Sequence, residues 1–359
     1  MPEIVGPFSS VTTTMSSLDG HITHLRHLTN SRIAYDLLID QFQFSKTQAR
    51  ESSKLICAHV GQSLEFHHQS RFSSITIRPV LQYYCYLNLA VAAILAYRPS
   101  NYNQYRRHGV EDLTHAIISL DLPSIVLRVQ KGAVPLFHSI ISDQSLYKKK
   151  FRFGNLTAGF HMVSHELATR FGKIIQAVEV NDQVKEISGS WYSEFSFTPF
   201  IDGKKGKISA QRIEDAMPLL SSDYKKLSSV DERIIYESVV KWTSEAEAKR
   251  IHKANGLRLI NFGGHSAYPG GPLIQPECRY VWRGVSRVPL LPTLTSLILM
   301  AFSLASVSRY RPALLHQALG SPIHLIIDTF LQEADSIFIP SLRNLLYREE
   351  TAVGSVYCI

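Results

Sequence analysis

Arg311 and His316 form the residue pair in this sequence whose types and spacing best suit a reaction on RNA. An Arg can stabilise a scissile phosphate while a His exchanges a proton during attack by the ribose 2′-hydroxyl. Residues five apart on a helix lie about 140° from one another, so a full site would need the same pair from a second copy of the chain. The alternative is that Arg311 closes the apolar helix before it and that His316 is a surface residue.

Two short basic segments could bind phosphate groups. The first holds Arg106 and Arg107, and the second is a run of four cations: Lys148, Lys149, Lys150 and Arg152. The formal net charge is +8 and the sequence pI is about 9.2, a modest excess for this length. These residues are therefore the candidate nucleic-acid-binding set, and solvated surface charge is the alternative interpretation.

Other patterns with chemical potential are incomplete. His161 and His165 have the i and i+4 spacing of a helical metal site, but no third ligand is evident. The four cysteines form no C-x-x-C pair, and the Gly-rich segment 261–272 contains no nucleotide-binding motif. We therefore expect no metal and no cofactor, and a small-ligand enzyme with its site under the Gly-rich segment is the third functional option.

An apolar helix over residues 79–97 is the element expected to organise these residues. Pro79 stands where a helix can begin and Pro99 where it must end. The helix is apolar nearly all round, and its narrow polar stripe consists of Gln82, Cys85 and Asn88. Such a helix must be buried on most sides, so we expect it to be the central post of a domain.

A second apolar segment, residues 288–308, contains no charged residue over a length that could span a bilayer. Pro289 and Pro292 near its start, together with six Ser or Thr residues, favour a buried helix over 292–308 instead. We expect helices 79–97 and 292–308 to lie inside the protein and against each other, with no membrane span.

The remaining pattern predicts a mainly α fold, in which both chain ends form one helical domain around a mixed α/β middle. The predicted regions are a flexible arm over 1–20, a helical region over 21–150, a mixed region over 151–285, and a helical region over 286–359 that packs on the first. Further helices are predicted over 30–41, 46–69, 160–180, 208–253 (with Asp231 as a cap), 311–319, 321–333 and 340–349. Strands are predicted within 124–137, 190–200 and 279–285.

The composition suits a globular protein with one or two domains: 359 residues, 45% of them hydrophobic and 19% charged. Cys57 and Cys85 stand in apolar helical context, and scattered cysteines of this kind fit a reducing cytoplasm. The first residues have neither the basic region nor the apolar region of a secretory signal. We therefore expect a cytoplasmic location.

Four blocks of this sequence resemble the YaaC-like protein family: residues 78–92, 108–110, 129–137 and 299–312. Their order and spacing carry the resemblance, while residues 150–280 match only vaguely. The resemblance implies a bacterial, cytoplasmic, mostly helical protein with no established activity, so it transfers no catalytic residue. The family pattern has an aromatic residue shortly after the last block, where this chain has Leu315 and His316.

The functional expectation is a non-enzymatic helical interaction component of a bacterial multi-protein system, such as one in anti-phage defence. Its expected partners are another protein, nucleic acid or both, and self-association is left open. The alternative is a HEPN-like ribonuclease that uses Arg311 and His316.

Overall fold

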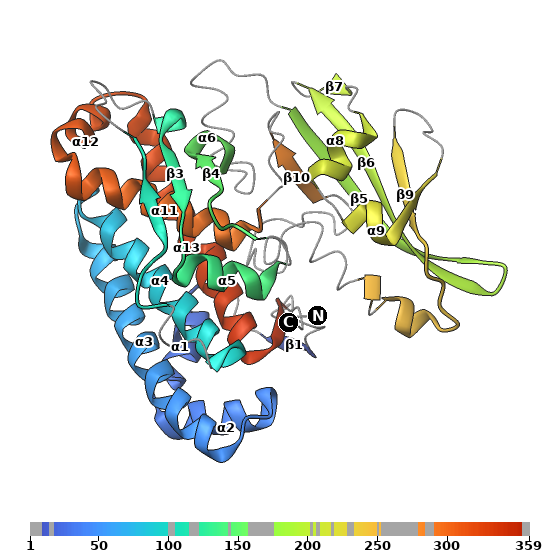
Figure 1. Cartoon of the computed structure of the whole chain (residues 1–359), viewed down its shortest axis with the longest axis horizontal. Helices are drawn as coiled ribbons and strands as arrows, with labels where there is room; N and C mark the ends of the chain where they lie inside the picture. Colours follow the sequence, from blue (N-terminus) through green and yellow to red (C-terminus); the bar gives the residue numbers. More distant parts are fainter. Residues whose placement is uncertain are drawn as a thin grey trace, which may run out of the picture. The chain divides into compact units, whose positions relative to one another are not determined.

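The computed structural model describes residues 9–13, 18–99, 105–114, 122–142, 145–156, 176–201, 204–205, 209–216, 219–227, 233–249, 251–252, 279–283 and 291–353. The chain divides into two compact units (Figure 1). Unit 1 consists of residues 1–156, 266–270 and 294–359, and unit 2 consists of residues 157–265 and 271–293. Unit 1 is therefore built from both ends of the chain.

Helices dominate unit 1, which confirms the prediction of a mainly α fold formed by both chain ends. The N-terminal helices are α1 (Leu18–His27), α2 (Ser31–Phe42), α3 (Lys46–Phe72) and α4 (Arg78–Tyr97). The C-terminal helices are α11 (Thr293–Tyr310), α12 (Pro312–Leu319) and α13 (Ile323–Tyr347). Within the unit, α3 and α13 both pack on α4, and α1 packs on α13.

Local signals explain where the N-terminal helices begin. The Asn30 side chain accepts a hydrogen bond from the backbone N–H of Arg32 and caps α2. Ser45 and Gln48 form a capping box at the start of α3, in which each side chain serves the other residue's backbone. Such caps satisfy N–H groups that have no partner inside the helix.

Helix α4 is the buried post that the sequence predicts, and its polar stripe is also buried. Asn88 Oδ1 lies 2.8 Å from His59 Nδ1 on α3. The Ser63 hydroxyl, also on α3, donates to the Cys85 carbonyl at 2.9 Å. The Gln82 amide donates to Asp335 on α13 at 2.8 Å. The stripe therefore fastens α4 to α3 and α13.

Helix α11 is buried as well, and it contacts α4 as expected. The rings of Tyr83 and Phe302 meet edge to face with centroids 5.4 Å apart, and the Arg309 guanidinium donates to the Tyr84 hydroxyl at 3.0 Å. Helices α4 and α11 are long and apolar enough to cross a membrane, but 72% and 83% of their respective apolar windows are buried within the protein. Long core helices of this kind are weak evidence for a membrane span.

A small antiparallel sheet lies on the helices of unit 1. It consists of β2 (Val110–Asp112), β3 (Val126–Val129) and β4 (Lys150–Arg152), with β3 in the centre. The 3-10 turn η2 (Leu122–Ser124) precedes β3 and the short helix α6 (Phe153–Leu156) follows β4.

The segment 124–137 is half strand and half helix. Its second half was expected to be a strand, but it begins helix α5 (Ala133–Ile141), so that prediction is wrong. Pro135 falls within the first turn of the helix, where its missing N–H has no cost. The buried residues Val134, Phe137, His138 and Ile141 have helical spacing.

Segments near the two chain ends pair in unit 1. Strand β1 (Ser9–Thr13) pairs in parallel with β11 (Glu349–Val353). Strand β1 lies within residues 1–20, the region expected to form a flexible arm, and α1 begins at the end of that region. The predicted helices 321–333 and 340–349 are in fact one helix, α13, with Pro340 inside it. Burial of Phe338, Ile339 and Leu342 on both sides of the proline offsets the roughly 3 kcal/mol that an internal proline costs.

Unit 2 is organised by an antiparallel sheet with the strand order β10-β5-β6-β9-β8, and β7 pairs with β6. The strands are β5 (Gln176–Ile187), β6 (Ser190–Ile201), β7 (Lys204–Lys205), β8 (Tyr224–Lys226), β9 (Ile234–Ser238) and β10 (Arg279–Arg283). A two-residue turn joins β5 to β6, and both Ser188 and Gly189 have positive φ, as such hairpins require. The predicted strands 190–200 and 279–285 are confirmed in position.

Two helix predictions in unit 2 are wrong over most of the residues that the structure describes. In the described parts of 208–253, the short helices α8 (Ala210–Ala216) and α9 (Leu219–Asp223) precede β8 and β9, and residues 245–249 and 251–252 are helical again. Ile234 and Tyr236 are buried where β9 pairs with β6, so sheet pairing outweighs the local helical preference. The described part of the predicted helix 160–180 is residues 176–180, and these lie in β5. Residues 157–175 and the expected cap Asp231 lie outside the described residues.

Candidate functional site

The four blocks that carry the family resemblance come together in unit 1. The rings of Tyr83 from α4 and Phe302 from α11 are in contact, and the His108 ring lies 5.2 Å from Phe302 and 6.5 Å from Tyr83, measured between centroids. The block 129–137 joins this group through the backbone next to His108, because the Val134 N–H donates to the His108 carbonyl at 3.0 Å. The segment around His108 is thus fixed on the helical core.

Two glycines permit this junction. Backbone hydrogen bonds of 2.8 Å run from the Gln130 N–H to the Gly109 carbonyl and from the Ala133 N–H to the Arg107 carbonyl. A Cβ atom on Gly132 would lie 2.4 Å from the Arg107 oxygen, and Gly109 has φ +78°. Both positions therefore require glycine, and the backbone after Arg107 is held against the end of β3.

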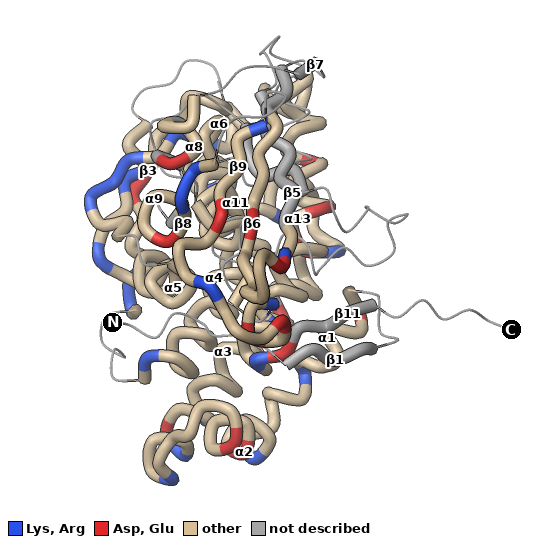
Figure 2. Tube along the Cα trace, turned by 90° about the vertical axis from the view of Figure 1, so that its right-hand side faces the viewer, with Lys and Arg blue, Asp and Glu red and all other residues tan. Residues whose placement is uncertain are grey.

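This junction brings the two predicted basic segments to one small sheet. The Lys148 N–H donates to the Val129 carbonyl at 2.9 Å, and the Val129 N–H donates to the Lys149 carbonyl at 3.0 Å. The end of β3 therefore lies between the segment that holds Arg106 and Arg107 and the segment that begins at Lys148. We call the exposed cations here the basic sheet surface: Arg106, Arg107, Lys131, Lys148, Lys149, Lys150 and Arg152. Figure 2 shows Lys and Arg positions gathered beside the strand labelled β3.

The alternation of β4 explains why its cations face outward. Phe151 is buried, whereas its neighbours Lys150 and Arg152 are exposed on the opposite side of the strand. In the register, Lys150 lies opposite Arg128 and Phe151 lies opposite Leu127, which is also buried. One face of the sheet thus covers the core and the other carries charge.

The positive charge of this surface is largely uncompensated. Arg128 is neutralised by Glu111, with its Nη2 atom 2.7 Å from Oε2, so it is not counted in the surface. Among the described residues, Arg107, Lys131, Lys148, Lys149, Lys150 and Arg152 form no ion pair with an acidic side chain. Lys131 was not among the predicted site residues; its place directly before Gly132 in the third block is the signal that could have identified it.

The two residues of the ribonuclease hypothesis have different surroundings in the structure. The Arg311 guanidinium donates to the Thr114 carbonyl and lies 3.3 Å from Asp112 Oδ2 in an ion pair. His316 is exposed on α12. Arg311 also ends α11, since its N–H donates to the Val307 carbonyl at 2.9 Å. The described contacts of Arg311 thus fasten α11 to the segment after β2.

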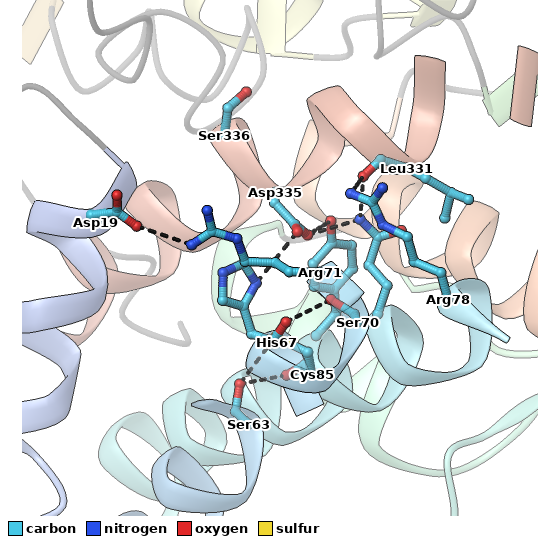
Figure 3. A network of polar contacts seen from close by, with 12 residues as sticks. Asp19, Ser63, His67, Ser70, Arg71, Arg78, Cys85, Leu331, Asp335 and Ser336 are labelled. Atoms are coloured by element: carbon cyan, nitrogen blue, oxygen red, sulfur yellow. Dashed lines mark hydrogen bonds and ion pairs between the residues drawn. The ribbon is translucent and has the colours of Figure 1, made fainter. Parts of the chain in front are cut away.

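A buried polar network in the helical core was not predicted as a group (Figure 3). Asp335 on α13 accepts hydrogen bonds from the Tyr86 hydroxyl at 2.7 Å and from the Gln82 amide at 2.8 Å. His67 Nδ1 on α3 approaches the other carboxylate oxygen at 3.3 Å, an ion-pair contact longer than those hydrogen bonds. The Arg78 guanidinium donates to the Leu331 carbonyl at 2.6 Å.

The electrostatics of this network favour a structural role. Burial acts to raise the pKa of Asp335, but its contacts with His67, Tyr86 and Gln82 outweigh it and hold that pKa below its ordinary value. Burial, and then the charge of Asp335, raise the pKa of the neighbouring Cys85 thiol far above its usual range. Cys85 therefore stays protonated and is a poor nucleophile, while the carboxylate stays charged and joins three helices.

A serine and a histidine in unit 2 are in contact, as in a nucleophilic pair, but the serine is not exposed to solvent. Ser193 Oγ on β6 lies 2.7 Å from His252 Nδ1 and 3.0 Å from the Tyr224 hydroxyl. Ser193 is fully buried and its N–H donates to the Ser238 hydroxyl at 3.1 Å. The group fastens neighbouring parts of the unit 2 sheet, and its nucleophile is closed to a substrate.

No group of three or more His, Cys, Asp or Glu side chains in the described ranges could hold a metal ion. The paired His161 and His165 and the Gly-rich segment 261–272 lie outside those ranges.

The whole chain was compared with known proteins. No curated protein and no solved structure matches it. The model of the family described as YaaC-like protein matches residues 24–346, nearly the whole length. This range includes all four blocks and both basic segments, which unit 1 brings together. The chain therefore belongs to the YaaC-like protein family.

Proposed function

We propose that this protein is a non-enzymatic interaction component that binds nucleic acid through the basic sheet surface. The observation that carries the proposal is the convergence of two basic segments, distant in sequence, on the end of one strand. Backbone hydrogen bonds fix both segments against β3, so the charges are presented by a folded surface.

The chemistry of the surface suits a phosphate backbone. Lys and Arg side chains without acidic partners exchange their counterions for phosphates, and release of those counterions drives binding. Six exposed cations from three segments, Arg107, Lys131, Lys148, Lys149, Lys150 and Arg152, form no ion pair among the described residues and offer several phosphate contacts at once. The proposal includes a cytoplasmic location. A soluble protein there has access to both RNA and DNA.

Contacts elsewhere favour binding over catalysis. Arg311 is engaged by Asp112 and Thr114, and the Ser193 hydroxyl is fully buried. These side chains have structural partners instead of the open geometry that a substrate needs. Binding is the function that the exposed residues support best.

The proposal is tested by removing charges from the surface and, separately, from a matched control. The test variant carries Lys149→Ala, Lys150→Ala and Arg152→Ala; it leaves Lys148 unchanged because that residue has a positive φ of 64°. The control carries Lys46→Ala, Arg50→Ala and Lys54→Ala, which removes three exposed cations from α3. Both variants have the same net charge, so only the position of the lost charge differs.

Fluorescence anisotropy with labelled oligonucleotides at low salt measures the binding. We expect the wild type and the α3 control to bind alike and the test variant to bind at least about tenfold more weakly. If both variants bind oligonucleotide equally weakly, the effect depends on net charge and not on the basic sheet surface. Binding of polyglutamate without binding of oligonucleotide would assign the surface to an acidic protein partner and overturn the proposal.

A further inference from the structure

Tyr147 stands within the basic sheet surface and is 43% exposed. The Lys148 ammonium lies 5.3 Å from the centroid of its ring and the Lys131 ammonium lies 5.9 Å from it. The ring is therefore surrounded by charges that could bind phosphates. We propose that this surface takes single-stranded nucleic acid, with one base stacked on Tyr147; the inference rests on the proposed function.

The backbone around Tyr147 is fixed against the sheet and the core. The Lys149 N–H donates to the Leu146 carbonyl at 3.0 Å and closes a turn, while the Lys148 N–H is bound to Val129 of the sheet. Leu146 is buried and anchors the turn to the core. The Tyr147 N–H donates to the Ser145 hydroxyl at 3.3 Å. An aromatic ring on such a turn loses little freedom when a base stacks on it.

Exposed aromatic rings among cations are the usual means of holding unpaired bases. Every base has a π-face, so stacking adds affinity without sequence preference, while the neighbouring cations follow the backbone. Inside a duplex, both faces of each base are covered by adjacent base pairs, so Tyr147 could not stack on an interior base without unstacking the helix. The arrangement therefore selects unpaired strands.

The two lysines near the ring do not block it. Lys131 and Lys148 are exposed, and their flexible stems allow the ammonium groups to move toward phosphates. A cation–π contact at an exposed site is weaker than stacking of a base on a ring. Exchange of the first contact for the second is therefore favourable when a strand binds.

The experiment compares single-stranded and double-stranded labelled oligonucleotides of equal phosphate number. Four proteins are tested: wild type, Tyr147→Ala, Tyr147→Phe, and Phe72→Ala as a control. Phe72 ends α3 and is 79% exposed, so its removal deletes an exposed aromatic ring elsewhere. Fluorescence anisotropy at one low salt concentration gives the affinities.

We expect the wild type to prefer the single strand, and Tyr147→Ala to weaken that binding about tenfold while leaving duplex binding unchanged. Tyr147→Phe keeps the ring and is expected to bind like the wild type, as is Phe72→Ala. Equal affinity for both strands with no effect of Tyr147→Ala would overturn the inference and leave the proposed function standing. Absence of binding to either oligonucleotide would instead refute the proposed function.

Discussion

The carboxylate of Asp335 shows at the scale of one residue how the core depends on polar contacts. It is 3% exposed, and it carries its charge because Tyr86, Gln82 and His67 surround it. A carboxyl group whose pKa is depressed by folding adds stability above its unfolded pKa, near 3.8 here. That contribution is lost as the pH falls through the lower pKa of the folded state.

Asp335→Asn is expected to lower the free energy of unfolding by about 3 kcal/mol, because it removes one partner of a buried charged contact. The stability lost on acidification should shrink in the same variant. Urea denaturation between neutral and acid pH measures both effects. Asp328→Asn is the control, since Asp328 accepts a hydrogen bond from the exposed Gln332 on the same helix and has no other described partner. A control that costs as much as the test variant would contradict a special role for Asp335.

The sequence predicts only the part of this network that lies on helix 79–97. The stripe of Gln82, Cys85 and Asn88 stands out because the rest of helix 79–97 is apolar. Its partners His67 and Asp335 lie in helices whose own patterns contain many polar residues, so nothing local marks them. The same limit applies to the site: runs of basic residues are visible in the sequence, whereas their convergence depends on strand pairing between distant segments.

At the scale of elements, the contact between Gly109 and Gly132 sets the position of the basic sheet surface. Gly132→Ala is expected to destabilise the protein by about 1–3 kcal/mol, because the new Cβ would meet backbone atoms that cannot move independently. It should also weaken oligonucleotide binding by displacing Arg106 and Arg107. Chemical denaturation and anisotropy on the same preparation measure the two effects.

Gly61→Ala is the matched control for that substitution. Gly61 lies inside α3, and a Cβ there would meet only the Thr29 methyl group at an ordinary 3.9 Å. Replacing a glycine in a helix with alanine stabilises it by about 0.5–1 kcal/mol. The two substitutions should thus have opposite signs, and a neutral Gly132→Ala would show that the close approach is unimportant.

Arg311 and His316 separate the structural interpretation from the ribonuclease hypothesis. Arg311→Ala is expected to cost on the order of 1–3 kcal/mol, because it removes a charged donor from Asp112 and Thr114. His316→Ala should change stability by no more than about 0.5 kcal/mol, since the side chain is exposed. Both variants and the wild type should lack RNA cleavage. Cleavage by the wild type that His316→Ala abolishes without unfolding would establish the ribonuclease.

Prediction of individual elements succeeded where burial and local pattern agree. Helices 79–97 and 292–308 are apolar on nearly every side, and both form as expected. The segment 133–137 reads equally well as a strand or a helix, because its apolar residues are consecutive. Ile234 and Ile235 belong to a strand because β9 pairs with β6 on one side and with β8 on the other.

At the scale of the whole molecule, unit 1 is closed by contacts between the first and last helices. Arg343 on α13 is buried and donates to Glu349 at 2.6 Å, and its Nη2 lies 3.0 Å from His24 Nδ1 on α1. The Tyr347 hydroxyl donates to the His24 carbonyl at 2.8 Å. Two apolar helices must be covered, and from this the sequence predicts that both chain ends share a core. The specific contacts of Arg343 and Tyr347 cannot be predicted from the sequence.

His21 makes this closure sensitive to pH. Burial, followed by the charges of Arg343 and His24, lowers the pKa of His21 from 6.5 to about 4. Between pH 6.5 and 4, His21 binds a proton in the unfolded chain but not in the folded chain. Stability therefore falls as the pH drops through this range. The loss attributable to His21 should be on the order of 1–3 kcal/mol.

Replacement of His21 by Gln is expected to remove this part of the acid sensitivity, whereas His27→Gln, at an exposed position on the same helix, should retain it. Urea titrations at several pH values measure the difference. Parallel pH profiles for wild type and His21→Gln would contradict the assignment.

The central claim, that the basic sheet surface binds phosphates, is tested most directly by the salt dependence of oligonucleotide binding. A plot of log affinity against log salt has a slope of about −0.7 for each phosphate neutralised on a single strand. Loss of three surface cations in the Lys149→Ala, Lys150→Ala, Arg152→Ala variant should make the slope less negative by about 2, whereas the α3 control should keep the wild-type slope. Identical slopes for all three proteins, or a wild type that does not bind at low salt, would contradict the claim.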